Sequence, residues 1–284
     1  MHTVTLAAPP ALGPLLARGA LRSPFKRPAP DAAVPRTRLV LPGVRVDLAH
    51  LAAYERVCGF PTGESALPLT YPHVLGFPLA MRLMSGRDFP LPLLGLVHTF
   101  VEIERRTALP ADESYEISVW VAELTARRSG TEAVVVTAVR SEGEVVWSSR
   151  SGYLARTEGP APRDTAGVRE RLPTVAEWRL GGDVGRRYGA VSGDRNPIHL
   201  HPCTARLFGF PRAVAHGMWT LARCLAAHGT PATTVVRARF RAPVLLPGTV
   251  AYGADGRGRF ELRGEGGRLC VAGSVRGGGS VRGG

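Results

Sequence analysis

Residues 188–218 read YGAVSGDRNPIHLHPCTARLFGFPRAVAHGM. Asp194 and His199 are five positions apart, which would separate them by about 140° on a helix and place them on opposite faces of a strand. Gly193 and Pro197 interrupt both kinds of regular structure. We therefore expect an irregular turn, because only such a turn brings a carboxylate and an imidazole to one small site. There the two groups could hold a water molecule and exchange protons with it.

Two helices are predicted after this turn. Residues 202–208 form a short helix that ends at Gly209, and residues 217–228 form a longer helix that ends at Gly229. Gly217 begins the longer helix, where unpaired N–H groups and the positive end of the helix dipole can stabilise a negatively charged oxygen. Spacing alone leaves a second interpretation open, in which the carboxylate is a helix cap and the imidazole is a surface side chain.

The chain on either side of this segment indicates two similar halves. Strand patterns occupy residues 97–103, 115–121, 133–139 and 145–153 in the first half, and 174–184, 235–240, 249–252, 259–262 and 269–275 in the second. An irregular stretch is expected after residue 184. A helix laid across an antiparallel sheet is the simplest way for each half to bury its apolar face.

A weak internal repeat supports this division. The matching residues of the first half are Tyr54, Cys58, Gly59, Gly76-Phe77-Pro78 and Leu109-Pro110. Their counterparts in the second half are Tyr188, Ser192, Gly193, Gly209-Phe210-Pro211 and Leu246-Pro247. Each half is therefore predicted to be one copy of the same module.

A signature in the second copy resembles that of the MaoC-like family, whose members are (R)-specific enoyl-thioester hydratases and (3R)-hydroxyacyl-thioester dehydratases. It consists of Tyr188, Ser192-Gly193-Asp194, Asn196-Pro197-Ile198-His199, Ala205, Gly209-Phe210 and Ala215-His216-Gly217-Met218. The resemblance implies an α+β double hot-dog fold, in which two antiparallel sheets each wrap a central helix and join as a pseudo-dimer. Many family members carry Asp where this chain has His201, and this position is expected to support the loop or face solvent.

The resemblance also implies roles for individual residues. Asp194 and His199 would be the catalytic pair, and Asn196 and Gly217 would bind substrate. Asn196 would order the water and the loop, and the Gly217 N–H would donate to the oxyanion. The activity implied is reversible hydration and dehydration of 2-enoyl and (3R)-hydroxyacyl thioesters of CoA or acyl carrier protein in fatty-acid or related lipid metabolism. No cofactor and no metal is signalled.

The predicted domains follow from the break at residues 158–164 and from the repeat. They are an N-terminal leader at 1–45 that wraps onto a neighbouring domain or frays, a degenerate hot-dog domain at 46–156, a linker at 157–173, a catalytic MaoC-like domain at 174–276 and a flexible tail at 277–284. Phe60 stands where the second copy has Asp194, and Leu69 aligns with His199, so the first copy is predicted to be catalytically silent. It could supply an apolar tunnel for a long acyl chain, or it could be only a structural half.

Two other classes of function stay open beside the hydro-lyase. The chain could be a non-catalytic acyl-thioester-binding subunit of a heteromeric dehydratase, or a hot-dog thioesterase. A monomer with pseudo-dimeric halves is expected, and a homodimer is left open.

The charge of the chain first suggests a different kind of partner. The net charge is +13 over 284 residues, which raises nucleic acid or a membrane surface. Lys26 is the only lysine, however, and the arginines are scattered, so the excess resembles genomic base composition and no nucleic-acid partner is expected. Arg195, Arg206 and Arg212 flank the signature and could meet CoA phosphates or an acidic carrier protein.

Location is predicted from what the sequence does not contain. No basic segment precedes the first apolar stretch, and no apolar window reaches the roughly 18 residues of a membrane span. The cysteines lie far apart and fit reduced, mostly buried thiols: Cys58, Cys203, Cys224 and Cys270. A cytoplasmic protein without membrane association is therefore expected.

Overall fold

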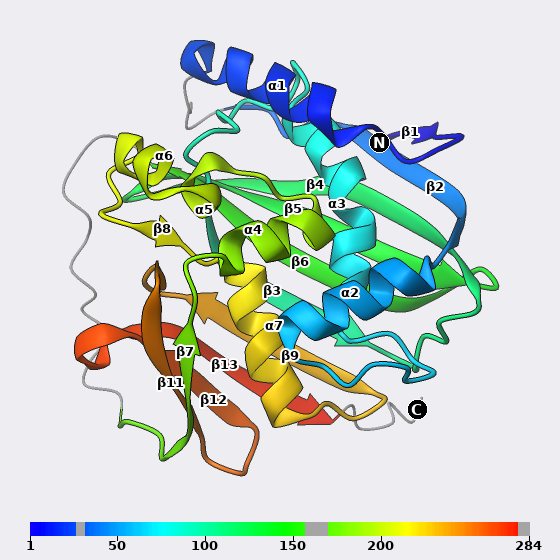
Figure 1. The fold of residues 1–284 in the computed structure, drawn as a ribbon. Helices are drawn as coiled ribbons and strands as arrows, with labels where there is room; N and C mark the ends of the chain where they lie inside the picture. Colours follow the sequence, from blue (N-terminus) through cyan, green and yellow to red (C-terminus); the bar gives the residue numbers. More distant parts are fainter. Residues whose placement is uncertain (27–31, 157–169, 278–284) are drawn as a thin grey trace.

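The computed structural model describes residues 1–26, 32–156 and 170–277, and Figure 1 shows their arrangement. The predicted linker falls mostly outside these residues, and so does all but the first residue of the predicted tail. An 11-stranded sheet has the order β1-β2-β4-β5-β6-β3-β9-β13-β12-β11-β7, and all its neighbours are antiparallel except β1 and β2. Its strands are β1 (His2–Thr5), β2 (Thr37–Arg45), β3 (Val97–Arg105), β4 (Ser114–Arg127), β5 (Gly130–Ser141), β6 (Glu144–Arg156), β7 (Thr174–Leu180), β9 (Thr234–Phe240), β11 (Gly248–Ala254), β12 (Arg259–Arg263) and β13 (Leu269–Gly277).

Each half of this sheet holds one long apolar helix. In the first half, α3 (Tyr71–Met84) contacts β2, β4 and β5, and in the second half α7 (Gly217–His228) contacts β12. Leu79 of α3 and Leu221 of α7 are both fully buried, as expected for helices enclosed by a sheet. The α+β hot-dog arrangement is therefore present twice (Figure 1).

The two halves join in the middle of the sheet, where β3 pairs with β9. In this register Val101 lies opposite Ala238 and Ile103 lies opposite Val236, and these side chains are almost completely buried. Arg105, at the end of β3, donates a hydrogen bond from Nε to the carbonyl of Ala232 at 2.8 Å. The halves thus share one continuous sheet and core, as a pseudo-dimer does.

Shorter helices precede the central helix in each half. The first half has α2 (Leu48–Cys58), and the second has α4 (Val184–Ser192), α5 (Pro197–Leu200) and α6 (Pro202–Leu207). The last two are followed by β8 (Ala213–Val214), which pairs with β10 (Leu245–Leu246). α2 and α4 contact each other across the junction of the halves.

Most predicted elements are confirmed, and one correction concerns the stretch after β7. It was expected to be irregular, but residues 184–192 form α4. Gly185 and Gly189 lower helix propensity, which hid the helix in the sequence. In the structure both glycines allow the following loop to approach, since a Cβ at Gly185 would lie 1.9 Å from the carbonyl oxygen of His199.

A second correction concerns the repeat. Gly76-Phe77-Pro78 lies inside α3, whereas Gly209-Phe210-Pro211 lies between α6 and β8, so this match was wrong. The reason is that α5, α6 and β8 occupy a longer interval in the second half than residues 59–70 do in the first. The structural counterpart of the start of α7 is the start of α3.

The described part of the leader packs onto the first half. β1 pairs with β2, β2 pairs with β4, and α1 (Leu12–Arg22) contacts α3. The sheet therefore continues across the domain boundary that the sequence suggested at residue 45.

Of the cysteines, Cys58, Cys224 and Cys270 are buried thiols and Cys203 is exposed. None of the helices in the described ranges is long and apolar enough to span a membrane.

Candidate active site

The turn predicted around Asp194 lies between two helices. α4 ends at Gly193, whose φ of 76° is in the left-handed region, and α5 begins after Asn196. Asp194 Oδ1 accepts a hydrogen bond from the Asn196 N–H at 3.1 Å, and Asn196 Oδ1 accepts one from the Ile198 N–H at 3.4 Å. Asp194 and Asn196 thus both stabilise the turn, and the Asp194 side chain keeps 33% of its surface exposed.

The orientation of His199 is fixed by a short hydrogen bond. Its Nδ1 lies 2.6 Å from the carbonyl oxygen of Val214 in β8. A carbonyl only accepts, so Nδ1 carries the proton and donates. In the neutral ring Nε2 is therefore the atom with a lone pair, which is the form that a general base requires.

His216 completes a compact cluster with these residues. Its ring centroid lies 3.7 Å from that of His199, and its Nε2 donates to the backbone carbonyl of Asp194 at 2.9 Å. The same Nε2 lies 3.9 Å from Asp194 Oδ2. His216 lies in the signature directly before Gly217, which was the only signal of its place in the site, and its position in the sequence assigned it no role.

Burial and mutual electrostatics set the protonation of the cluster. Burial lowers the pKa of His216 to about 3, with His199 adding to the effect, so His216 is neutral. Burial also lowers the pKa of His199, although Asp194 and the Val214 carbonyl oppose this. Burial alone would raise the pKa of Asp194, but His216, His199 and the Asn196 N–H outweigh it, and the pKa lies below its usual value. A carboxylate beside a neutral imidazole is the expected state.

Gly217 places the start of α7 beside these groups. Its N–H belongs to the first turn of the helix, where backbone donors lack intrahelical partners. A Cβ at Gly217 would lie 3.2 Å from the Phe240 ring, which is tighter than ordinary contact. Glycine therefore keeps the space between the helix terminus and Phe240 open.

The candidate residues Asp194, Asn196, His199 and Gly217 line one cavity of about 1070 Å³, together with His216. Both halves contribute to its wall. The first half supplies apolar side chains from α1, α3 and the segment before β3, among them Leu16, Phe77, Met81, Met84 and Leu96. A cavity of this size accommodates a ligand larger than the reacting carbons alone.

Four exposed arginines belong to the lining of the cavity. Arg156, Arg195, Arg241 and Arg268 are all exposed and all line it. Of the arginines expected near the substrate, only Arg195 lies here. Arg206 donates to the Pro211 carbonyl at 3.4 Å, and Arg212 donates to Glu265 at 2.8 Å.

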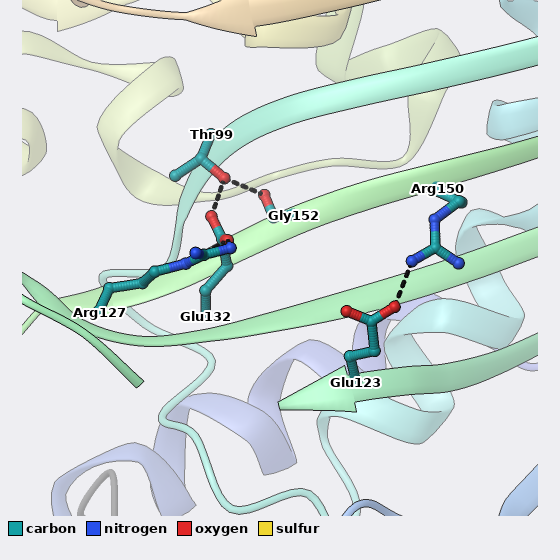
Figure 2. Close-up of polar contacts among 6 residues, drawn as sticks. All are labelled: Thr99, Glu123, Arg127, Glu132, Arg150 and Gly152. Carbon is teal, nitrogen blue, oxygen red and sulfur yellow. Dashed lines mark hydrogen bonds and ion pairs between the residues drawn. The ribbon is translucent and has the colours of Figure 1, made fainter. Parts of the chain in front are cut away.

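A buried carboxylate anchors the strands beside the cavity (Figure 2). Glu132 of β5 accepts hydrogen bonds from Arg127, the nearer at 2.7 Å, and its other oxygen lies 2.5 Å from the hydroxyl of Thr99 in β3. Thr99 lines the cavity. A second ion pair, between Arg150 of β6 and Glu123 of β4, reaches across the intervening strand β5.

The cluster has the donor types of a metal site as well. Asp194, His199 and His216 each offer a ligand atom, and these atoms lie within 4.8 Å of one another. His199 and His216 already direct one nitrogen each at a backbone carbonyl. That the reaction needs no metal or cofactor stays a prediction.

His201 caps α6 by accepting from the Cys203 N–H at 3.2 Å, so it supports the loop.

Comparison with known proteins identifies the family of the chain. Residues 170–265 match the family described as MaoC like domain. The chain is 36% identical over 236 residues to 3-hydroxyacyl-thioester dehydratase X of Mycobacterium tuberculosis, covering 81% of this chain and 84% of that protein. A crystal structure of HtdX from the same organism matches with a TM-score of 0.75 at 34% identity, covering 84% of this chain and 99% of that one.

A more distant structure bears on the fold alone. It is a conserved hypothetical protein of Mycobacterium tuberculosis described as having a double hot-dog fold, with a TM-score of 0.52 at 13% identity, covering 88% of this chain and 95% of that one. The chain thus belongs to the MaoC-like family of hydratases and dehydratases, has the double hot-dog fold and is a hydro-lyase.

Proposed function

We propose that the chain catalyses the reversible hydration of 2-enoyl thioesters and dehydration of (3R)-hydroxyacyl thioesters, with Asp194 and His199 as the acid and base. The observation that carries the proposal is their convergence with Gly217 on one cavity. The name of the relative that is 36% identical, a 3-hydroxyacyl-thioester dehydratase, supports the same substrate class.

In the dehydration direction the pair handles two protons. Asp194 and His199 jointly remove the proton from C2 and deliver a proton to the hydroxyl on C3. The C2–H and C3–O bonds break, the C2=C3 double bond forms, and the hydroxyl leaves as water. The proton on His199 Nδ1 is engaged with Val214, so Nε2 is the ring atom available for transfer.

Gly217 would act on the thioester oxygen. As C2 loses its proton, negative charge develops on this oxygen, and the Gly217 N–H together with the helix dipole would stabilise it. Such a donor typically lowers the barrier by about 3 kcal/mol. Burial keeps His216 neutral, so it would place Asp194 through its backbone contact without adding a charge to the site.

The two sides of the cavity suit the two ends of such a substrate. Exposed arginines, Arg195 among them, would attract the phosphates of CoA or of the phosphopantetheine arm of acyl carrier protein. The apolar side chains of α1 and α3 would receive the acyl chain. Of the two roles considered for the degenerate half, this favours the acyl tunnel.

The test is a hydration assay of the purified chain on 2-enoyl-CoA substrates of increasing length, with the configuration of the product at C3 determined. We expect loss of enoyl absorbance and a (3R) product. Release of free thiol without loss of enoyl absorbance would indicate a thioesterase instead. Binding without turnover by the lone chain would indicate a subunit that needs a partner.

A further inference from the structure

Two histidines of the first half line the cavity and have no part in the mechanism above. His73 lies in the first turn of α3, and His98 lies near the start of β3. Their rings are nearly parallel, at 14°, with centroids 6.2 Å apart. The half that lacks the catalytic pair therefore still contributes polar side chains to the cavity.

A bulge in β3 directs His98 toward the cavity. Successive side chains of a regular strand point to opposite faces, yet Val97, His98 and Thr99 all line the cavity. The register of β3 with β6 shifts between His98 and Phe100, where the strand passes Gly152. A Cβ at Gly152 would lie 2.3 Å from the Phe100 ring, so only glycine permits this approach.

The bulge is held by the contacts of Figure 2. Thr99, within the bulge, bonds Glu132, which Arg127 in turn neutralises. The bulge leaves one residue of β3 without a partner in the sheet, and the buried carboxylate of Glu132 supports it. Bulges next to binding sites commonly re-aim a side chain, and here the side chain is that of His98.

Each ring has a nitrogen without a partner. His73 Nδ1 and His98 Nε2 are buried, and neither has a hydrogen bond to any residue that the structure describes. Buried polar atoms are nearly always paired, and an unpaired one is destabilising. Burial lowers the pKa of His73 to about 4 and of His98 to about 3, so both rings are neutral. The other nitrogen of His98 donates to the backbone carbonyl of Phe100, so its Nε2 is an acceptor, whereas His73 Nδ1 can act as a donor or an acceptor.

The position of the pair indicates which part of a substrate would reach it. His98 lies between Tyr153 and Phe240, with ring centroids 4.7 Å away in each case, and Phe240 covers Gly217. The two histidines are thus close to Gly217, where the thioester would bind, on the part of the cavity wall that the first half supplies. With the carrier at the exposed arginines, as the proposed function has it, the acyl chain is what passes the two histidines.

We propose that His73 and His98 form a polar subsite that hydrogen-bonds an oxygen on the acyl chain beyond C3. The preferred substrates are then acyl thioesters with a hydroxyl group in the chain, which can donate to His98 Nε2 and accept from His73 Nδ1, an inference that rests on the proposed function. The ring torsion of histidine has a broad minimum, so a modest rotation turns either unpaired nitrogen toward a ligand. The oxygen would supply the missing partner.

The test compares kcat/KM for trans-2-octenoyl-CoA with that for its 5-hydroxy, 6-hydroxy and 7-hydroxy analogues. We expect at least one hydroxy substrate to be preferred by about tenfold, the effect of one well-formed hydrogen bond. His73→Phe and His98→Phe should reduce this ratio to about one. His73→Gln, which keeps a donor and an acceptor, should restore part of it.

Two controls separate this role from a structural one. His228→Phe removes a histidine that bonds Tyr252 away from the cavity, and it should leave the ratio unchanged. The melting temperature of the His73→Phe and His98→Phe variants should stay the same or rise, because each removes an unpaired buried nitrogen. A marked fall in both would show that the rings are satisfied within the folded protein and would overturn the proposal.

The outcomes distinguish this inference from the proposed function. If octenoyl-CoA is hydrated and no hydroxy analogue is preferred, the subsite is wrong and the function stands. If the ratio persists in both phenylalanine variants, the subsite is also wrong. If no enoyl-CoA is hydrated at all, the proposed function itself fails.

Discussion

Helices α2 and α4 occupy corresponding positions in the two halves. The residue that follows the C-terminal glycine of each helix differs between the halves. Each follows an aspartate, Asp47 or Asp183, and each ends at a left-handed glycine, with φ of 78° and 76°. After the glycine the first half has Phe60, which stacks on Tyr54, and the second has Asp194, which faces the cavity. The same left-handed glycine at the end of a helix thus precedes a packing residue in one half and a carboxylate at the cavity in the other.

The central helices show a similar difference at their first residues. α3 begins with Tyr71, which is fully buried and hydrogen-bonded to His50 at 2.8 Å. α7 begins with Gly217, which leaves its N-terminus open to the cavity. The start of the central helix is therefore available to a ligand in the second half, where the proposed function uses it, and is occupied by a buried tyrosine in the first.

The largest expected effect concerns the catalytic pair. Asp194→Asn and His199→Ala should each lower kcat by at least about a hundredfold, as expected for loss of a general acid or base. Phe60→Leu, at the corresponding position of the first half, should change kcat by less than about threefold. Steady-state hydration of an enoyl-CoA by folded variants measures both. A nearly normal rate in either catalytic variant would refute the assignment.

Substitution of the first residue of the second-half central helix should have the next largest effect on kcat. Gly217→Ala should lower kcat by about 10- to 100-fold, because the added Cβ crowds Phe240 and obstructs the N–H. Tyr71→Phe, its counterpart, should preserve kcat and cost about 1 kcal/mol of stability through loss of the bond to His50. Kinetics and denaturant unfolding of the two variants test this. Equal kinetic effects would remove the distinction between the helix starts.

The pH dependence follows from the protonation of the second-half cluster. The pKa values of both Asp194 and His199 lie below their usual values, 3.8 and 6.5. Each group keeps its basic form until the pH falls through its lowered pKa, so kcat/KM should be flat near neutral pH and decline only below about pH 6. A pH profile measured on folded enzyme tests this. An acid limb centred at or above about pH 7 would contradict it.

A smaller effect is expected at the arginines. Arg195→Ala should raise KM about two- to fivefold at low salt, and the difference should shrink as salt screens the attraction. Arg206→Ala should leave KM unchanged, because this side chain lies outside the cavity lining and bonds Pro211. The measurement is KM for an acyl-CoA at two ionic strengths. Equal changes in both variants would indicate a general effect of charge.

The smallest effect distinguishes the caps of α2 and α4. Asp47 accepts hydrogen bonds from the N–H groups of Ala49 and His50, whereas the Asp183 side chain makes no cap bond. Asp47→Ala should therefore cost about 1 kcal/mol of unfolding free energy, and Asp183→Ala less than about 0.5 kcal/mol. Denaturant unfolding of both variants measures the difference. A larger loss for Asp183→Ala would reverse this view of the caps.

Local patterns predicted much of the fold. Strand alternation identified β3 to β6 and the strands of the second half, and α7 was placed correctly because glycines stand at both of its ends. α4 was missed because its glycines serve tertiary packing, which propensity does not include. The repeat was misaligned at Gly76 because the extra helices of the second half have no counterpart in the first.

The site was predicted in part, for a physical reason. Asp194, Asn196, His199 and Gly217 lie on one contiguous segment, so the family signature identified them together. His216 was in that segment but its contacts with Asp194 and His199 depend on the folded turn. His73 and His98 could not be found in the sequence, because a bulge and the packing of one half against the other bring them to the cavity.

The pairing of β3 with β9 has a further consequence for how the two halves can differ. Because both lie on one chain, their association is intramolecular and does not weaken on dilution. In a symmetric homodimer every substitution occurs on both sides of the interface. Here, under the proposed function, the first half can carry Phe60 in place of a carboxylate and present His73 and His98 while the second half carries Asp194 and His199. Covalent linkage is what permits such an asymmetric site.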